Sequence, residues 1–315
     1  MTPAGAGSVL VIGATGLIGS QTAERLEAAG EPVIRASRSG READLACELT
    51  RPDSVLAALK TTSPGAVVLA AGLSSVGAAW EEPAEAFAAN TRGTLNLLEA
   101  IRVAAPTTHL LTASSGSVYG LPAAGTGGRA EPFTEEDPLN PASPYAASKA
   151  AAELLCAQYA RGHGLAVTTA RIFNQLGPGQ PAAQAASDFA REIALAEARE
   201  EARVVLEVGN LGTERDYTDV RDTARALAGL VERRAEGVFN VCSGTAVSLA
   251  SVVEGLAGQT PLEVRVEVKP DRAHPVDPPV VAGSNAKLTA ATGWVPGIGV
   301  VESLRDLLED WRRRV

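Results

Sequence analysis

The chain has 315 residues, 45% of them hydrophobic, and carries a formal net charge of −9. A chain of this length can form a substantial hydrophobic core. Its net negative charge argues against a nucleic-acid partner. The three cysteines and three histidines lie far apart without metal-ligand spacing, and no apolar run reaches membrane-spanning length. We therefore expect no metal site, no membrane partner, reduced thiols and, without a leader-like N-terminus, a cytoplasmic location.

The N-terminal part of the sequence contains a glycine-rich turn between a strand and a helix. Residues 9–12 form an apolar run of strand length, and Gly-Ala-Thr-Gly-Leu-Ile-Gly follows at residues 13–19. Gly13 allows a tight turn, Gly16 lets the backbone approach a pyrophosphate, and Gly19 lets the helix pack on the strand. The helix start then offers N–H groups and a positive dipole to the phosphates. The sequence predicts dinucleotide contacts at Gly13, Thr15, Gly16, Leu17 and Ile18.

The end of the second predicted strand, residues 33–36, bears on the choice of dinucleotide. An acidic residue here usually accepts hydrogen bonds from the ribose 2′-hydroxyl of NAD. This chain instead has Ser37 followed by Arg38, and a guanidinium beside hydroxyls suits a 2′-phosphate. NADP(H) is therefore the favoured cofactor. NAD(H) is the alternative, with Arg38 as a surface charge and Asp44 or Glu48 supplying the acid.

Strand-like and helical stretches continue to alternate along the first half of the chain. Further apolar runs occupy residues 66–70, 110–113 and 167–171. This alternation predicts an α/β fold, a Rossmann-like doubly wound parallel sheet with a smaller C-terminal α/β substrate lobe. We assign residues 1–171 to the nucleotide-binding domain, with residues 216–242 returning to it, and residues 172–215 and 243–315 to the lobe.

Tyr145 and Lys149 are the residues that indicate chemistry most directly. They lie four positions apart at the entry to a helix predicted over residues 147–161, so they share one helix face. An ammonium next to a phenol stabilises the phenolate and lowers the pKa of the phenol. The pair therefore predicts a general acid/base that moves a proton to or from a hydroxyl or carbonyl.

Three further segments carry a resemblance to a known family. Residues 115–120 read Ser-Gly-Ser-Val-Tyr-Gly, residues 70–74 Ala-Ala-Gly-Leu-Ser, and residues 90–94 Asn-Thr-Arg-Gly-Thr. With the glycine turn and the Tyr–Lys pair, they resemble the extended short-chain dehydrogenases/reductases of the NAD-dependent epimerase/dehydratase family. The resemblance implies that Ser115 binds a substrate oxygen as a third catalytic residue beside Tyr145 and Lys149. It also implies cofactor contacts at Glu48, Leu49, Ala70, Ala71, Gly72, Asn90, Tyr145, Lys149 and Phe173.

The second half of the chain narrows the resemblance. Residues 171–174 (Arg-Ile-Phe-Asn), 177–180 (Gly-Pro-Gly-Gln) and 209–216 (Gly-Asn-Leu-Gly-Thr-Glu-Arg-Asp) are similar to the group of GDP-mannose 4,6-dehydratases and GDP-6-deoxy-4-keto-hexose reductases. The implied ligand is a sugar nucleotide, with a GDP-sugar favoured. The implied substrate contacts are Ser74, Ser117, Asn174, Arg191, Arg215, His274 and Asp277. His274 stands where the family usually has Arg, which leaves the identity of the nucleotide and the sugar open.

Position 117 separates the chemistries of that family. Two residues after the catalytic Ser or Thr, the 4,6-dehydratases carry Glu and the 3,5-epimerases carry Cys, whereas this chain has Ser117. A serine hydroxyl is neither a near-neutral acid nor an easy base. The resemblance then implies NADPH-dependent reduction of the 4-keto group of a GDP-4-keto-6-deoxyhexose. A nucleotide-sugar 4-epimerase is the first alternative, and a dehydratase-like enzyme or a non-catalytic nucleotide-binding regulator is the second.

Two predicted helices bear on assembly. The helix over residues 91–104 and the helix over residues 147–161 each carry an apolar stripe, which includes Leu98, Ile101 and Leu154. In the family that the sequence resembles, these helices pair with their symmetry mates in a four-helix bundle, and a two-fold contact needs only one self-complementary patch. We therefore predict a homodimer, although each helix must also pack on the sheet.

Overall fold

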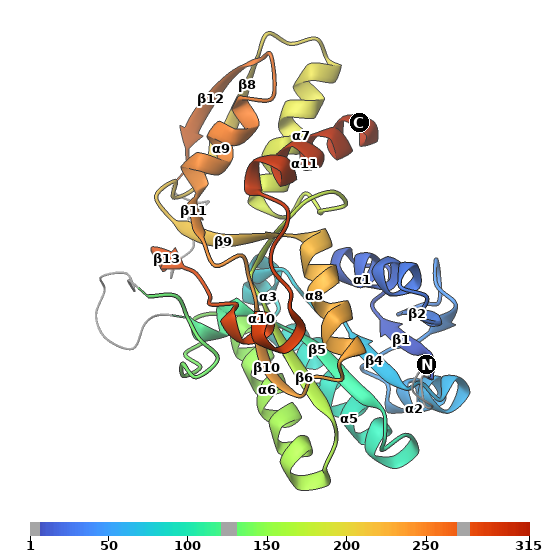
Figure 1. Ribbon diagram of the computed structural model, residues 1–315. Helices are drawn as coiled ribbons and strands as arrows, with labels where there is room; N and C mark the ends of the chain where they lie inside the picture. The colour runs from blue at the N-terminus through green and yellow to red at the C-terminus, as the bar shows by residue number, and fades with distance from the viewer. Residues whose placement is uncertain (1–6, 121–130, 270–277) are drawn as a thin grey trace.

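The computed structural model describes residues 7–120, 131–269 and 278–315, which form two parts (Figure 1). The larger part contains a seven-stranded sheet in the order β10-β6-β5-β4-β1-β2-β3, in which all neighbours pair in parallel. Its strands are β1 (Val9–Ile12), β2 (Val33–Ser37), β3 (Leu45–Ala46), β4 (Ala66–Leu69), β5 (His109–Ser115), β6 (Val167–Ile172) and β10 (Gly237–Val241). The predicted α/β fold with a doubly wound parallel sheet is confirmed.

Helices cover both faces of this sheet because apolar side chains alternate between the faces along each strand. Val9 and Val11 of β1 pack with α1 (Leu17–Ala28), α8 (Val220–Glu232) and α10 (Ala286–Thr292). Leu10 and Ile12 point to the other face, which is covered by α2 (Pro52–Thr62), α5 (Gly93–Ala104) and α6 (Pro144–His163). Shorter helices follow β4 and β5, namely α3 (Val76–Glu81), α4 (Pro83–Ala86), the π-helix η1 (Phe87–Arg92) and the 3₁₀-helix η2 (Gly116–Tyr119).

The smaller part has its own apolar core, drawn at the upper end of Figure 1. Three helices enclose this core, namely α7 (Ala185–Ala198), α9 (Leu249–Ala257) and α11 (Val300–Arg314). One side is a parallel pair, β8 (Arg203–Val208) with β12 (Glu263–Val268). The strand β9 (Glu214–Asp219) pairs with β7 (Asn174–Leu176), β11 (Ala246–Ser248) and β13 (Val280–Val281). The domain boundaries given above remain a prediction, and α10 lies on the large sheet.

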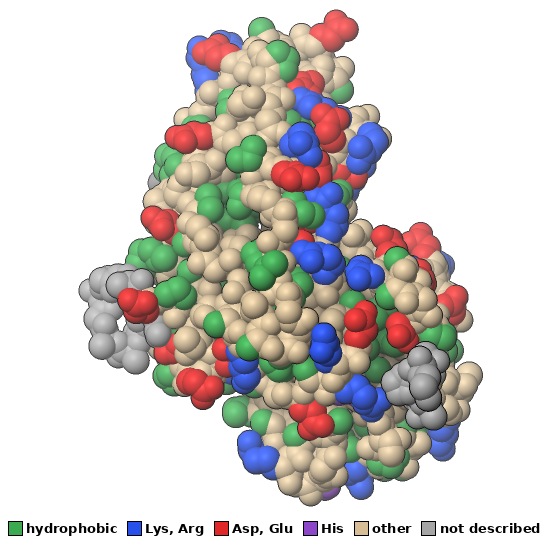
Figure 2. All heavy atoms as spheres, in the orientation of Figure 1, with side chains coloured by type: hydrophobic (Ala, Val, Ile, Leu, Met, Phe, Trp, Pro, Cys, Tyr) green, Lys and Arg blue, Asp and Glu red, His purple; other side chains and the backbone are tan. Residues whose placement is uncertain are grey.

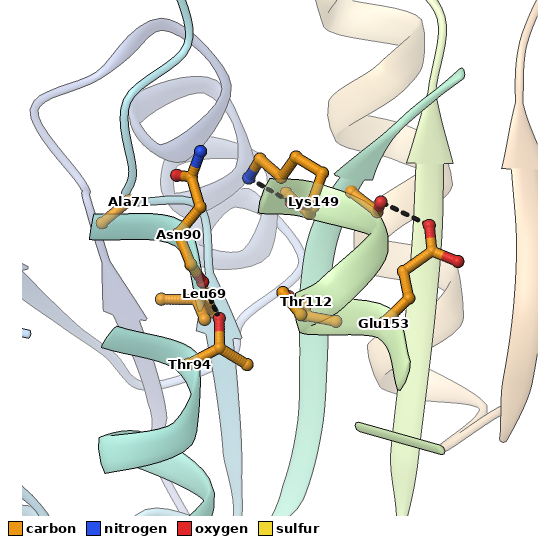
Figure 3. Close-up of a pocket in the computed structure, with 10 residues that line it drawn as sticks. Leu69, Ala71, Asn90, Thr94, Thr112, Lys149 and Glu153 are labelled. Carbon is orange, nitrogen blue, oxygen red and sulfur yellow. Dashed lines mark hydrogen bonds between the residues drawn. The ribbon is translucent and has the colours of Figure 1, made fainter. Parts of the chain in front are cut away.

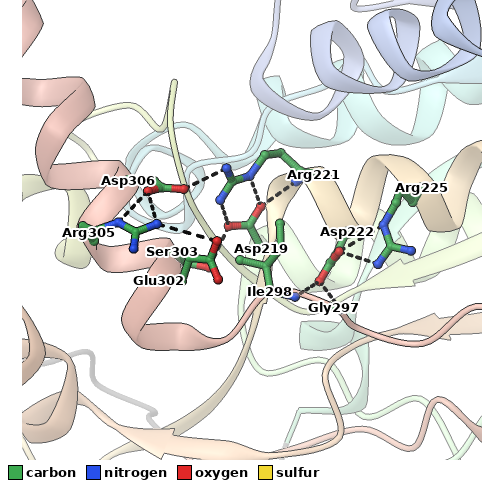
Figure 4. A network of polar contacts seen from close by, with 10 residues as sticks. All are labelled: Asp219, Arg221, Asp222, Arg225, Gly297, Ile298, Glu302, Ser303, Arg305 and Asp306. Carbon is green, nitrogen blue, oxygen red and sulfur yellow. Dashed lines mark hydrogen bonds and ion pairs between the residues drawn. The ribbon is translucent and has the colours of Figure 1, made fainter.

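A polar network joins the two parts at the start of α8 (Figure 4). Asp219 caps α8 by accepting a hydrogen bond from the backbone N–H of Arg221 at 2.9 Å. The same carboxylate accepts from the Ser303 hydroxyl of α11 at 2.6 Å. The Arg221 guanidinium lies 2.8 Å from Asp306, also on α11. These contacts fix α11 of the smaller part against α8, which packs on the large sheet.

The two helices predicted to mediate assembly differ from the sequence expectation. The helix α6 begins at Pro144, three residues before the predicted start, because Ser143 caps it through the backbone N–H of Ala146. Leu98 and Ile101 are fully buried between α5 and the sheet, so their stripe belongs to the core. Leu154 of α6 is 62% exposed.

The surface shows no single sign of charge on the face drawn in Figure 2, where acidic and basic side chains are interspersed. None of the helices in the described part of the chain is both long and apolar enough to cross a lipid bilayer.

Candidate active site

The glycine turn after β1 has the geometry of a phosphate cradle. Gly13 has a φ of +92°, and a Cβ atom there would lie 2.6 Å from the Ala71 nitrogen. A Cβ on Gly19 would lie 2.1 Å from the Gly13 carbonyl oxygen, so this close approach also requires glycine. Gly16 precedes α1 in an extended conformation, and no side chain of the described residues caps the helix. The first N–H groups of α1 therefore suit the pyrophosphate of a dinucleotide.

The end of β2 brings together the residues predicted to select the dinucleotide. Ser37 is buried, and its hydroxyl donates to the carbonyl of Arg41 at 3.0 Å. The Arg38 side chain is 85% exposed, and its Nε lies 3.5 Å from a carboxylate oxygen of Glu48. Arg38 and Glu48 thus occupy the same corner of the site, where a guanidinium suits a 2′-phosphate and a carboxylate suits ribose hydroxyls.

Asn90 organises the loop after β4. Its side-chain oxygen accepts from the Leu73 nitrogen at 3.0 Å, and its amide donates to the Leu73 carbonyl at 3.1 Å. The same amide donates to the Ser148 hydroxyl on α6 at 2.9 Å. A Cβ on Gly72 would fall 2.3 Å from the Asn90 side-chain oxygen. Asn90 therefore ties the loop of Gly72 and Leu73, which includes a predicted cofactor contact, to the helix that carries Lys149.

Ser115, Tyr145 and Lys149 meet at the carboxyl end of β5. The Ser115 hydroxyl hydrogen-bonds the Tyr145 phenol and lies 2.8 Å from the Ser117 hydroxyl. Because Tyr145 stands in the first turn of α6, Lys149 follows one turn later, and its Nζ donates to the Ala113 carbonyl at 2.8 Å. The structure thus brings together the three residues predicted to be catalytic.

The electrostatics of this triad differ in one respect from the sequence expectation. Burial raises the pKa of Tyr145 above its ordinary value, and the hydrogen bond with Ser115 opposes this rise. Lys149 was expected to lower that pKa, but its ammonium contacts the Ala113 carbonyl. Burial also lowers the pKa of Lys149 to about 8, with Glu153 acting in the opposite direction. At neutral pH the phenol is protonated and the amine is largely cationic, which suits proton donation.

Phe173 lies behind the turn that carries Ser115 and Ser117. Its ring is buried, and a Cβ on Gly116 would lie 2.9 Å from that ring. The ring packs in a cluster with Val118 and Tyr119 of η2, Ala150 of α6 and Cys242, which follows β10. Phe173 therefore packs against the turn that carries Ser115 and Ser117, and its contact with the cofactor remains a prediction.

The residues predicted to contact substrate are spread over both parts of the molecule. Ser74 and Asn174 are exposed. Arg191 on α7 forms ion pairs with Asp188 at 2.9 Å and Glu192 at 2.8 Å. Arg215 on β9 donates to the carbonyls of Glu214 and Pro278, both at 2.8 Å. His274 and Asp277 lie outside the described residues, so the substrate contacts stay predictions.

Sequence reasoning missed two buried carboxylates near the site. Asp216 is fully buried and accepts from the backbone and hydroxyl of Ser243 at 2.7 and 2.6 Å, and from the Gly244 nitrogen at 2.9 Å. It clamps the loop after β10. Glu153 lies on α6 and pairs with Arg171. Its position four residues after Lys149 was the one available signal.

Within the described ranges, no cluster of His, Cys, Asp and Glu is arranged to hold a metal ion.

A parallel doubly wound sheet with a glycine turn after β1, and a Ser–Tyr–Lys triad at its carboxyl edge, defines a dinucleotide-dependent oxidoreductase of the short-chain type. Residues 9–242 match the model of the NAD dependent epimerase/dehydratase family, and the chain belongs to that family. The family resemblance inferred from the motifs is thereby confirmed.

Individual relatives in this family differ in activity. The chain is 37% identical over 308 residues to GDP-6-deoxy-D-mannose reductase of Pseudomonas aeruginosa, covering 98% of both chains. The structure of RMD from Pseudomonas aeruginosa complexed with NADPH superposes with a TM-score of 0.84 and 36% identity, covering 98% of this chain and 100% of that one. The UDP-glucose 4-epimerase of Thermus thermophilus, complexed with NAD, gives a TM-score of 0.84 and 31% identity with the same coverage.

Proposed function

We propose that this protein is an NADPH-dependent reductase of the 4-keto group of a GDP-4-keto-6-deoxyhexose. The observation that carries the proposal is the turn beside Tyr145, where Ser117 contacts Ser115 at 2.8 Å. Neither the carboxylate of a 4,6-dehydratase nor the thiol of a 3,5-epimerase occupies that position. The 37% identity to GDP-6-deoxy-D-mannose reductase over nearly the whole chain supports the same conclusion.

Each residue of the site has a separate role in this reduction. When bound, NADPH supplies the hydride that the carbonyl carbon receives. The Ser115 hydroxyl donates a hydrogen bond to the carbonyl oxygen and fixes its position. Tyr145 then gives its phenolic proton to that oxygen, so the product is an alcohol. Lys149, whose ammonium is held at the Ala113 carbonyl, would donate hydrogen bonds to the ribose of the dinucleotide.

Arg38 supports NADP(H) as the favoured cofactor. Its guanidinium projects into solvent at the end of β2, where the 2′-phosphate of the ribose would lie. The glycine cradle fits the pyrophosphate, since added Cβ atoms at Gly13 and Gly19 would collide with backbone. NAD(H) stays possible because the Glu48 carboxylate lies in the same corner.

A nucleotide-sugar 4-epimerase is the second candidate, and Glu48 is the observation that favours it. A carboxylate near the ribose would let the enzyme retain NAD through an oxidation and a re-reduction. The epimerase of Thermus thermophilus complexed with NAD shares 31% identity with the chain. We favour the reductase because Arg38, which lies nearer solvent, matches a 2′-phosphate.

We further propose a cytoplasmic homodimer. The cysteines Cys47, Cys156 and Cys242 are free thiols in the structure, as is usual in a reducing compartment. The contact surface of the dimer would be the outer side of α5 and α6, where Leu154 and Val103 are exposed.

Turnover assays on the purified protein separate these candidates. We expect NADPH to be oxidised with GDP-4-keto-6-deoxymannose, and UDP-glucose to stay unchanged in the presence of NAD. GDP-mannose should lose no water, since Ser117 is no substitute for a carboxylate base. Formation of a 4-keto-6-deoxy product from GDP-mannose would overturn the reductase proposal, as would epimerisation of UDP-glucose without reduction of the keto sugar.

A further inference from the structure

A buried ion pair lies directly beneath the catalytic residues. Glu153 of α6 and Arg171 of β6 each expose 6% of their side chains. The Arg171 Nη2 lies 2.8 Å from one carboxylate oxygen of Glu153, and its Nε lies 3.2 and 3.1 Å from the two oxygens. Two nitrogens of the guanidinium therefore contact the carboxylate, and the two buried charges neutralise each other. Without this pairing, either group alone would be costly to bury.

Both members of the ion pair form further hydrogen bonds, Glu153 with the segment that carries Ser115 and Arg171 with η2. The Ser114 hydroxyl, next to Ser115 in the chain, donates to Glu153 at 2.5 Å. Arg171 donates to the Tyr119 hydroxyl at 2.9 Å. Tyr119 in turn donates to the side-chain oxygen of Asn240 on β10 at 2.6 Å. Five elements are therefore joined through one buried carboxylate and one buried guanidinium.

Glu153 and Lys149 face the same small cavity (Figure 3). The cavity measures about 10 Å³, the space of one water molecule. The direct hydrogen-bond partner of Lys149 is the uncharged Ala113 carbonyl, and η1 and α5 contribute the uncharged Asn90 and Thr94 to the cavity wall. Beyond the cavity wall, α6 carries two further titratable groups, Tyr145 and Cys156. The network on the other side of Glu153 contains Arg171 of β6, Tyr119 of η2 and Glu135, whose carboxylate accepts from the Asn240 nitrogen. Of the cavity-lining residues, Glu153 is the carboxylate.

We propose that Glu153 is a positioning residue of the catalytic site, whose buried carboxylate places a negative charge at the cavity of Lys149 and holds Ser114, and with it Ser115, at the end of β5. The proposal rests on the catalytic roles given above to Ser115 and Lys149. Burial alone would drive Lys149 toward the neutral amine, and Glu153 opposes that effect. Arg171 is needed because a buried carboxylate without a charged partner is strongly destabilising.

Lysine titration tests the charge directly, without any substrate. The chain has only four lysines, at Lys60, Lys149, Lys269 and Lys287, so carbon-13-labelled lysine gives few NMR signals, and Lys149→Arg assigns the one of interest. We expect that signal to titrate near pH 8 in the wild type. In Glu153→Gln its midpoint should fall by about one pH unit. An unchanged midpoint in Glu153→Gln would overturn the proposal.

Tyr119→Phe is the matched control, because it removes a hydroxyl from the same network but no charge. The Lys149 midpoint should stay at its wild-type value in this variant. A shift equal to that of Glu153→Gln would mean that any disturbance of the network acts on Lys149, and the charge argument would fail.

A double variant keeps the test available if Glu153→Gln does not fold by circular dichroism. Glu153→Gln with Arg171→Met removes both buried charges and leaves none unpaired. Its Lys149 midpoint should still fall below the wild-type value, by less than in the single variant, because the more distant Arg171 is also lost. A midpoint at or above that of the wild type would refute the role of Glu153.

Enzyme kinetics test the consequences for the reaction. In Glu153→Gln, the alkaline limb of kcat against pH should move to lower pH in step with the Lys149 midpoint. Ser114→Ala should lower kcat roughly tenfold through misplacement of Ser115, with the Lys149 midpoint and the KM for NADPH unchanged. Wild-type kcat in Ser114→Ala would refute the Ser114 contact. If the wild type reduces no keto sugar, the proposed function fails while the titration still decides the role of Glu153.

Discussion

Tyr145 is a protonated phenol at neutral pH, and burial raises its pKa further above neutrality. A carbonyl reduction needs such a donor, since the oxygen of the product must gain a proton. Tyr145→Phe removes only the hydroxyl and should lower kcat about a hundredfold or more. NADPH affinity, measured by fluorescence titration, should stay close to that of the wild type. Turnover near the wild-type rate would remove Tyr145 from the mechanism.

The Arg38 guanidinium is exposed, and its Nε lies 3.5 Å from the Glu48 carboxylate. The other guanidinium nitrogens can therefore bind a phosphate. Arg38→Ala should weaken NADPH binding roughly tenfold or more, because a charge-assisted contact is lost. Calorimetric titration with NADPH and NADH measures the effect, and NADH serves as the internal control because it lacks the 2′-phosphate. An equal loss with both dinucleotides would mean that Arg38 does not meet that phosphate.

At the level of residues, the sequence predicted those parts of the candidate site whose geometry depends on local spacing. The glycine turn and the pair of Tyr145 and Lys149 each lie within one turn and its helix, where spacing determines geometry. Glu153 and Arg171 escaped prediction because their pairing depends on α6 packing beside β6. A glutamate on an alanine-rich helix otherwise resembles a solvent-exposed residue.

At the level of elements, alternation of apolar and helical stretches predicted the large sheet but not its details. The π-helix η1 (Phe87–Arg92) has no local sequence signal, and it merges into α5 where a plain helix was expected from residue 91. The strands β8 and β12 pair although about 55 residues separate them in the chain. The outward residues of β12 include Glu263 and Glu267, so this strand resembles an exposed segment. Such pairings depend on tertiary contacts.

The strand β5 contributes a buried histidine that should make stability depend on pH. His109 is fully buried, and its Nε2 lies 2.7 Å from the Thr168 hydroxyl of β6. Burial, with nearby Arg234, lowers the pKa of His109 from 6.5 to about 4. Above pH 6.5 the ring is neutral in both states, and its contribution to stability is fully present. As pH falls toward about 4, the unfolded chain binds the proton first, so stability is lost.

Urea unfolding across this pH range checks the effect, with His109→Gln as the comparison. Other groups also titrate, so the quantity of interest is the difference between the wild type and the variant. The free energy of unfolding should fall more steeply with decreasing pH in the wild type than in His109→Gln. Parallel curves would assign the pH dependence to other groups.

At the level of the whole molecule, an exposed apolar surface on one side of the large sheet requires an explanation. Val103 of α5 and Leu154 of α6 are 63% and 62% exposed. Trp80 of α3 and Phe87 of η1 are also exposed, and α3 and η1 both contact α6. Exposed apolar side chains that gather on neighbouring helices indicate a contact surface. A second copy of the chain can cover this surface through a two-fold axis, since such an axis needs only one self-complementary patch.

Leu154→Arg tests this dimer, because a charge at the centre of an apolar contact is costly to bury. Light scattering at micromolar concentration should give about twice the 32.3 kDa chain mass for the wild type and about 32.3 kDa for the variant. Val301→Arg is the matched control, since Val301 is 70% exposed on α11 in the smaller part. This control should leave the dimer mass unchanged. A wild-type mass near 32.3 kDa would mean that the apolar side of α5 and α6 faces solvent in the functional protein.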